Sequence, residues 1–435
     1  MNKQKATINL GLLGLGTVGS GTLELIRRNG ADITRKTGVK IHTTGALVRT
    51  LDKQRPISAD NDLKLTTNAD DILNDPNIDI IVELIGGINP AKEYITRALQ
   101  NGKHVVTANK DLLAQHGYEL FNIAKENNRS IYYEASVGGG IPLIRPLKNC
   151  LAANKIENLM GIINGTTNYI LTQMTKYEKE FAVALKEAQE AGFAEADPSS
   201  DLEGRDAAYK LSILASLAFN SRVDINDVHT ESIKGISVRD IMYAKQLNFV
   251  IKLLAIGEET ENGLALRVHP TLVPNNHPLA SVQNEFNALF LTGDAVGEVM
   301  FYGKGAGSFP TASAVVADIM EAVRKISGQV QNGNIETTFD TKPIISMEEQ
   351  TSRFYLRLKA NDQSGVFGRV ATALGDENVS LDMILQNQRS DGRAEIVLIT
   401  HDTKEENFYR ALDKIKSLDS ISTINNVIRV LERGN

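Results

Sequence analysis

The chain has no tryptophan and a single cysteine, Cys150, in 435 residues. One cysteine cannot form an intrachain disulfide or a thiolate cluster, which excludes zinc fingers and iron–sulfur centres and fits a reducing compartment. No apolar run approaches the ~20 residues that span a bilayer, and the nearest one, residues 78–85, is typical of a buried strand. We therefore expect a cytoplasmic protein without a membrane partner.

Basic residues are too few for general nucleic-acid binding. The sequence has 47 lysines and arginines against 53 aspartates and glutamates, and neutralising phosphates requires clusters of basic residues that this sequence lacks. What is present is an ordinary globular composition, 42% hydrophobic and 23% charged, at a length that suits about three domains.

The first third of the chain alternates between strands and helices. Runs of β-forming residues predict strands at 7–13, 39–48, 78–85 and 103–107, separated by helices or loops. This order is typical of an α/β fold with a doubly wound parallel sheet. We interpret residues 1–135 as a Rossmann-like nucleotide-binding domain.

Beyond residue 135 the alternation stops. An α+β domain is expected at 136–330, with a strand at 156–163, helices around 168–190 and 204–219, β segments at 263–269 and 288–301, and a helix at 311–326. Residues 331–350 are rich in Asn, Thr and Gly and are interpreted as a linker. Residues 351–435 have the order βαββαβ of a ferredoxin-like module, with elements at 354–360, 366–374, 379–386, 394–401, 405–418 and 422–431 and a turn at 390–392.

The motif G-L-G-T-V-G at residues 14–19 follows the first strand and begins a helix. Gly14 allows the tight turn, Gly16 lets a pyrophosphate approach the backbone, and Gly19 permits close packing of the helix on the strand. The helix N-terminus favours the negative charge. The motif therefore predicts a dinucleotide site, and the alternative is a glycine-rich turn that binds nothing.

The second strand ends near Arg49, where NAD-preferring sites usually carry an acidic residue. Arg49, with Lys53 or Arg55, suits a 2′-phosphate instead, so we expect NADP to bind at least as well as NAD. Asp52 is near enough in sequence to be the missing acid, which leaves a solvated Arg49 as the alternative.

Two lysines are candidates for chemistry. Lys110 follows the fourth strand at the sheet edge where α/β proteins bind ligands. Lys210 lies four residues after Asp206 on a helix whose other positions are largely apolar, so we expect a half-desolvated pair. Burial disfavours the charge of the lysine and the neighbouring carboxylates favour it, and the sequence leaves this balance open. The alternatives are a solvated lysine at 110 and a surface ion pair at 206–210.

Glu134 lies shortly before a triple glycine, residues 138–140. Glycine tolerates unusual backbone dihedrals, so carbonyl groups of this loop can turn inward. One carboxylate with several carbonyls suits an alkali cation or Ca²⁺ better than zinc. A plain glycine turn is the alternative.

Longer motifs extend these patterns. The segment 188–210 carries Ala188, Gly192, Asp197, Pro198, Asp201, Gly204, Asp206 and Lys210. Others are N-G-K-H-V-V-T-A-N-K up to Lys110, E-A-S-V-G-G-G-I-P from Glu134, N-G-T-T-N-Y-I-L from Asn164 and G-K-G-A-G-S-F-P-T-A-S-A-V-V-A-D from Gly303. With these motifs, the whole chain resembles a monofunctional homoserine dehydrogenase with a C-terminal ACT domain, here residues 351–435.

The resemblance implies reversible, nicotinamide-dependent interconversion of L-aspartate 4-semialdehyde and L-homoserine, a step toward threonine, methionine and isoleucine. Lys210 resembles the catalytic acid/base and Lys110 the second active-site lysine. Glu195 and Asp206 resemble the contacts of the substrate amino group and hydroxyl, with Asp201 close by. This chemistry agrees with the residues, because hydride delivery to an aldehyde requires a proton for the developing alkoxide.

The implied cofactor is NADP, with NAD as the alternative. The residues that resemble its site are Gly14, Leu15, Gly16, Thr17, Val18, Gly19, Arg49, Lys110, Gly192 and Gly307. Glu134 and the carbonyls of Val137, Gly139 and Ile141 resemble the family's site for sodium or another alkali cation. The family also implies a homodimer or homotetramer formed through the middle domain, 136–330.

The ACT segment departs from the family pattern at Ser364, where a proline is common. The effector loop 361–367 is then less pre-organised for an amino acid, so we expect weak threonine inhibition at best. We also expect that a cut near Met347 leaves a soluble dehydrogenase. Two other functions stay open: a catalytically silent, NADP-occupied amino-acid sensor, and a dehydrogenase for another small aldehyde or amino acid.

Overall fold

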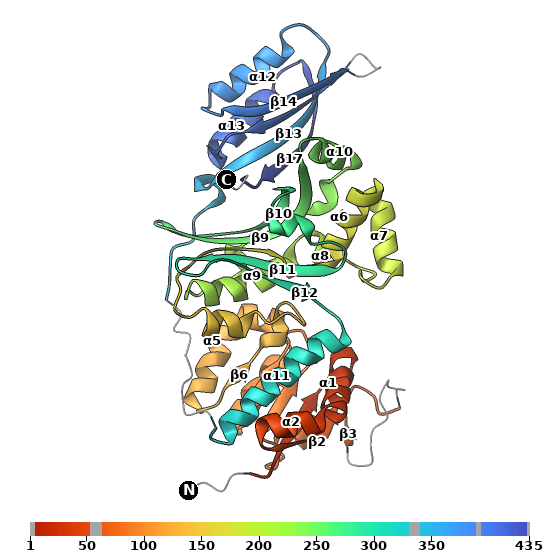
Figure 1. Ribbon diagram of the computed structural model, residues 1–435, viewed down its shortest axis with the longest axis vertical. Coiled ribbons are helices and arrows are strands. Elements are labelled where there is room, and N and C mark those ends of the chain that lie inside the picture. The colour runs from red at the N-terminus through yellow and green to blue at the C-terminus, as the bar shows by residue number, and fades with distance from the viewer. Residues whose placement is uncertain (1–4, 53–62, 330–339, 389–392, 433–435) are drawn as a thin grey trace. The chain divides into compact units, whose positions relative to one another are not determined.

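The computed structural model describes residues 5–52, 63–329, 340–388 and 393–432 (Figure 1). It divides into two compact units, each made of three stretches of chain. The first unit contains Met1–Ile156, Ser212–Ile225 and Gly293–Thr341, and the second contains Glu157–Leu211, Asn226–Thr292 and Lys342–Asn435. Within the described ranges, no helix is long and apolar enough to cross a membrane.

The first unit contains a six-stranded parallel sheet with the strand order β3-β2-β1-β4-β5-β6. Its strands are β1 (Thr7–Leu13), β2 (Lys40–Leu47), β3 (Lys64–Thr66), β4 (Ile80–Glu83), β5 (His104–Thr107) and β6 (Ile131–Tyr132). The predicted doubly wound sheet is confirmed. The order reverses between β1 and β4, and doubly wound sheets bind ligands beyond the carboxyl ends of the strands at such a point.

Helices cover this sheet, among them α1 (Thr17–Arg28), α2 (Gly30–Thr37), α3 (Asp70–Leu73), α4 (Ala91–Gln100), α5 (Lys110–Glu126) and α11 (Ser308–Ile326). Helix α11 lies beside α1 (Figure 1), and its buried Val315 and Ile319 share one hydrophobic core with Ile8 and Leu10 of β1. This corrects our interpretation of residues 311–326: the predicted helix forms, but it packs in the first unit and not in the middle domain.

In the second unit the strands β11-β7-β9-β10-β17-β13-β15-β14 follow one another in one sheet. They are β7 (Ile156–Ile162), β9 (Phe249–Thr260), β10 (Gly263–Pro274), β11 (Phe286–Gly293), β13 (Thr351–Asn361), β14 (Leu381–Gln388), β15 (Arg393–Thr400) and β17 (Ile421–Val430). The helices include α6 (Gly165–Tyr177), α7 (Phe181–Glu190), α8 (Ser199–Leu202), α10 (Val238–Gln246) and the part of α9 (Arg205–Ala218) up to Leu211. The segment expected as one β stretch at 288–301 is two strands, β11 and β12 (Gly297–Lys304).

The C-terminal segment has the predicted βαββαβ order. Its strands pair antiparallel in the order β17-β13-β15-β14, and α12 (Val366–Gly375) and α13 (Glu405–Lys416) lie on this sheet (Figure 1). The segment has its own core, in which Phe354 and Phe408 stack. It is also joined to the rest of the unit, because β17 pairs with β10. The predicted turn at 390–392 and most of the first half of the predicted linker, 331–339, lie outside the described residues.

Candidate active site

Lys210 and Asp206 form an ion pair on one face of α9, as their spacing predicts. The Nζ atom of Lys210 lies 2.6 Å from Oδ2 of Asp206 and donates a second hydrogen bond, 2.8 Å long, to the carbonyl oxygen of Ile163 at the end of β7. Only 13% of the Lys210 side chain and 12% of the Asp206 side chain are exposed. The half-desolvated pair is therefore confirmed, and the surface ion pair is excluded.

Asn164, which is not among the predicted site residues, joins two of the acids. Its Nδ2 donates to Oδ1 of Asp201 at 2.6 Å and to Oδ2 of Asp206 at 2.8 Å. Burial raises the pKa of Asp201, and the hydrogen bond from Asn164 offsets part of that rise. The one signal in the sequence is the position of Asn164 at the start of the motif N-G-T-T-N-Y-I-L.

Gly192 and Glu195 lie in the turn that follows α7. Gly192 has a φ of +76°, which suits glycine at the end of a helix. The turn is tied to the start of α6, because Thr166 Oγ1 donates to the carbonyl of Phe193 at 2.7 Å. Within the second unit the structure thus brings Asp201, Asp206 and Lys210 together and leaves the side chain of Glu195 exposed.

The glycine motif bends the chain from β1 into α1. Gly14 has a φ of +108°, and a Cβ at Gly19 would lie 2.3 Å from the carbonyl oxygen of Gly14, so both positions require glycine. A Cβ at Gly16 would meet no atom within 4 Å in the described residues. Leu15 is buried beneath the loop, and α1 starts at Thr17 followed by Val18. The open space at this helix N-terminus fits the pyrophosphate of a dinucleotide.

Two further glycine-rich loops of the first unit, the triple glycine at residues 138–140 and the loop that precedes α11, lie close together. The loop that precedes α11 also contacts the glycine motif. Gly307 precedes α11 with a φ of +122°, and Oγ of Ser308 donates to the carbonyl of Thr17 at 2.8 Å. A Cβ at Gly139 would lie 2.4 Å from the carbonyl oxygen of Gly305. The predicted nicotinamide position Gly307 and the triple glycine are therefore close to each other, and Gly307 is close to the start of α1.

Arg49 follows the end of β2 and is exposed, as is Asp52. The carbonyl of Leu47 accepts a hydrogen bond of 3.1 Å from the N–H of Gly14, which brings the end of β2 to the glycine motif. Arg49 thus lies at the edge of the sheet where the predicted 2′-phosphate would be. Lys53 and Arg55, named as its helpers, lie outside the described residues.

Lys110 is the first residue of α5, and 30% of its side chain is exposed. A buried network fixes the turn before it: Thr107 Oγ1 donates to Oε2 of Glu83 at 2.6 Å. The N–H of Asn109 donates to Thr107 Oγ1 at 3.0 Å, and its side-chain amide donates to the carbonyl of Gly87 at 2.7 Å. These bonds join the carboxyl ends of β4 and β5. No local sequence pattern predicts these bonds, because they connect residues of two separate strands.

Glu134 is 2% exposed, and its carboxylate accepts hydrogen bonds from backbone N–H groups. Oε1 accepts hydrogen bonds from the N–H groups of Leu143 (2.6 Å) and Ile144 (2.8 Å), and Oε2 accepts from the N–H of Arg145 (2.9 Å). A cation at this loop would therefore be held by main-chain carbonyls more than by this carboxylate. No group of three or more His, Cys, Asp or Glu side chains suited to a metal ion occurs in the part of the chain that the structure describes.

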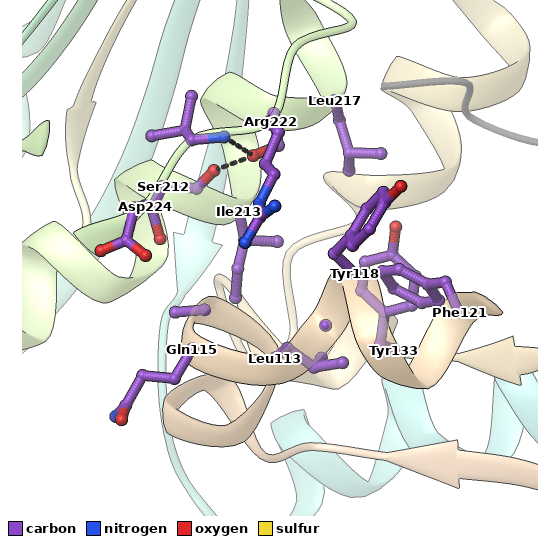
Figure 2. A pocket seen from close by; sticks show the side chains of 14 residues that line it. Leu113, Gln115, Tyr118, Phe121, Tyr133, Ser212, Ile213, Leu217, Arg222 and Asp224 are labelled. Atoms are coloured by element: carbon purple, nitrogen blue, oxygen red, sulfur yellow. Dashed lines mark hydrogen bonds between the residues drawn. The ribbon is translucent and has the colours of Figure 1, made fainter. Parts of the chain in front are cut away.

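A pocket lies between α5 and residues 212–224 (Figure 2). Its lining includes Leu113, Phe121 and Ile213, and the guanidinium of Arg222 lies over the ring of Tyr118, 4.9 Å from the centroid. Its volume of about 60 Å³ would hold only a few water molecules at about 10–15 Å³ each. None of the predicted site residues lines it, so this pocket is not the predicted cofactor or substrate site.

Comparisons with known proteins agree with this geometry. Residues 14–134 match a family model described as the NAD-binding domain of homoserine dehydrogenase, residues 142–320 match homoserine dehydrogenase, and residues 354–420 match the ACT domain. A homoserine dehydrogenase of Synechocystis sp. is 45% identical over 435 residues, covering 98% of this chain and 100% of its own length.

Solved structures give the same result. The crystal structure of a homoserine dehydrogenase from Thiobacillus denitrificans has a TM-score of 0.93 at 44% identity and covers 98% of each chain. A hyperthermophilic archaeal homoserine dehydrogenase in complex with NADPH has a TM-score of 0.63 at 27% identity, covering 73% of this chain and 98% of its own.

The Rossmann sheet, its glycine loop and these matches define an NAD(P)-dependent oxidoreductase that acts on CH–OH groups. Within that class, the chain belongs to the homoserine dehydrogenase family. It carries the C-terminal ACT domain that the sequence resemblance implied.

Proposed function

We propose that the chain catalyses the reversible reduction of L-aspartate 4-semialdehyde to L-homoserine, with Lys210 as the proton donor to the aldehyde oxygen. The observation that supports this role is the ammonium of Lys210 held between Asp206 Oδ2 and the carbonyl of Ile163. A lysine ammonium has three N–H donors. These two bonds occupy two of them, and the third can donate to a substrate oxygen. In the reverse direction the same amine accepts the proton.

The cofactor we propose is NADPH, with NADH as the alternative, and when bound it supplies the hydride. Residues 14–19 would hold its pyrophosphate at the N-terminus of α1, and Arg49 would hold its 2′-phosphate. Gly192 and Gly307 would line the nicotinamide. The archaeal structure with NADPH supports this choice of cofactor.

The substrate is an amino acid, so it needs partners for its ammonium group as well as for its aldehyde. The carboxylate of Glu195, exposed in the turn after α7, is the partner we assign to the ammonium, and Asp206, with Asp201 beside it, contacts the hydroxyl. Lys110, at the start of α5, serves as the second active-site lysine.

Further parts of the proposal rest on the family. Sodium, or another alkali cation, would bind the carbonyls of Val137, Gly139 and Ile141 near Glu134. An amino-acid effector would bind the ACT domain. The protein would work in the cytoplasm as a homodimer or homotetramer, in threonine, methionine and isoleucine biosynthesis.

The deciding experiment follows NADPH oxidation with L-aspartate 4-semialdehyde and, in parallel, with a small aldehyde that lacks the amino and carboxylate groups. We expect turnover only with the semialdehyde. NADPH binding without turnover on any aldehyde would overturn the proposal in favour of the amino-acid sensor. Equal kcat/KM values for both aldehydes would favour a dehydrogenase of other specificity.

A further inference from the structure

Asn164 is the N-cap of α6, and its side chain is fully used. Oδ1 accepts hydrogen bonds from the backbone N–H and from Oγ1 of Thr167, both at 2.9 Å. Nδ2 donates to Asp201 and to Asp206. Since a side-chain amide has two donors and an acceptor oxygen with two lone pairs, these four bonds exhaust its capacity. Only 4% of the residue is exposed.

The cap fixes which way this amide points. A backbone N–H can only donate, so the atom that faces Thr167 must be the oxygen, and the NH₂ group must face the acids. Both hydrogens of that group are directed to carboxylates that would otherwise repel each other. The oxygen Oδ2 of Asp206 accepts from Asn164 and from Lys210 at the same time.

The adjacent residue completes the arrangement, because the carbonyl of Ile163 accepts the other hydrogen bond of Lys210. The turn between β7 and α6 thus contacts both members of the ion pair: its backbone holds the lysine, and its side chain holds the aspartate. The charged groups around this amide in the described residues are Asp201 from α8 and Asp206 and Lys210 from α9.

We propose that Asn164 is a positioning residue, which holds the carboxylate of Asp206 where it orients Lys210. This inference rests on the proposed function of Lys210. Asn164 acts through the carboxylates and does not touch the substrate. Its second role, as the helix cap of α6, can be separated from positioning by substitution, because aspartate and serine also cap helices but do not supply two N–H donors.

The test compares Asn164→Asp and Asn164→Ser in the full chain, with thermal unfolding and NADPH binding as checks of folding. Asn164→Asp places a third carboxylate next to Asp201 and Asp206, and neighbouring negative charges raise the pKa of a carboxyl group. We expect kcat to fall about ten-fold or more near pH 7, and the acidic limb of the kcat/KM profile to move up by about one pH unit. Asn164→Ser should lower kcat with a smaller shift of the same limb.

Thr167→Val, which removes the contacts of the Thr167 hydroxyl to Asn164 and keeps the backbone N–H bond of the cap, is the matched control and should keep the wild-type pH profile. Lower kcat in both Asn164 variants with an unchanged acidic limb would show a purely structural role and overturn the inference. A folded Asn164→Ser variant with wild-type kcat would also overturn the inference, whether or not Asn164→Asp folds. Failure of the underlying function is recognised separately, because Lys210→Ala would then retain activity.

Discussion

The reaction proposed here depends on one proton donor, Lys210 on α9. Replacement of Lys210 by alanine should leave folding and NADPH binding intact, because the glycine loop belongs to other residues, and should lower kcat about 100- to 10,000-fold, the usual cost of losing a general acid. The control is Lys234→Ala: this lysine is 47% exposed and pairs with Glu203 at 3.2 Å, and its loss should change kcat by less than about two-fold. Half-retained activity in Lys210→Ala would refute the role.

The proposed preference for NADPH depends on one exposed side chain, Arg49. If Arg49 contacts the 2′-phosphate, Arg49→Ala should raise KM for NADPH about ten-fold or more, since a charge-assisted hydrogen bond contributes about 1.5–3 kcal/mol. KM for NADH should barely change. Arg35→Ala, which removes a surface arginine paired with Asp32, serves as the control. Equal changes for both cofactors would indicate a solvated arginine.

In the turn from β1 to α1, two glycines are needed for different reasons: Gly16 for the proposed binding of the pyrophosphate, and Gly19 for packing against the carbonyl of Gly14. A Cβ at Gly16 meets no protein atom, so Gly16→Ala should keep the wild-type Tm and weaken NADPH binding about ten-fold or more, a cost of about 1.4 kcal/mol. A Cβ at Gly19 meets the Gly14 carbonyl, so Gly19→Ala should also lower the stability, by about 1–3 kcal/mol. Calorimetric titration and thermal unfolding measure the two effects. Unchanged binding in Gly16→Ala would contradict the pyrophosphate assignment.

Buried polar contacts attach the C-terminal domain to the rest of the second unit. Arg357, on β13, bonds Asp240 of α10 at 2.7 Å and Glu395 at 3.0 Å, and all three side chains are nearly inaccessible. Burial alone would raise the pKa of Asp240, but the bonds from Arg357 and Ser237 outweigh it, so that this pKa is lowered.

A cut near Met347 would remove Arg357 and leave Asp240 without its cation. We therefore revise the expectation of a freely removable module: the truncated chain should have a lower Tm than the full chain and should aggregate in size-exclusion chromatography. Arg357→Met in the full chain should cost about 3–5 kcal/mol in unfolding, as expected when one partner of a buried ion pair is lost. A truncated chain with wild-type Tm would show that these contacts contribute little.

The ion pair between Glu231 and Arg429 of the C-terminal domain should make the free energy of unfolding depend on pH. Burial would raise the pKa of Glu231, but the hydrogen bond with His229 and the charge of Arg429 on β17 outweigh it and lower this pKa to about 2 from 4.5. A pKa lowered by folding stabilises the folded state above about pH 4.5, and this contribution is lost as the pH falls toward 2. The free energy of unfolding, measured with urea, should therefore fall more steeply between pH 4.5 and 2 in the wild type than in Glu231→Gln. Equal slopes would refute this.

Much of the molecule is encoded in short stretches of the chain. Four strands of the first sheet (β1, β2, β4 and β5), the glycine motif and the Asp206–Lys210 pair follow from residues a few positions apart, because a strand, a tight turn and one helix face are set by local dihedrals and side-chain spacing. The βαββαβ order of the C-terminal segment is encoded in the same way. The strands β3 and β6, of three and two residues, are too short to show a pattern.

Contacts between distant segments were decided only by the tertiary structure. Asn164 reaches Asp206 across 42 positions and Glu83 reaches Thr107 across 24. The packing of α11 on the first sheet and the pairing of β17 with β10 join segments still further apart. An amphipathic helix or an edge strand specifies that it must be covered but not by which partner, since apolar burial is non-directional and many surfaces would satisfy it. The choice among them is made when the whole chain packs, and it places Asn164 on the carboxylate of Asp206.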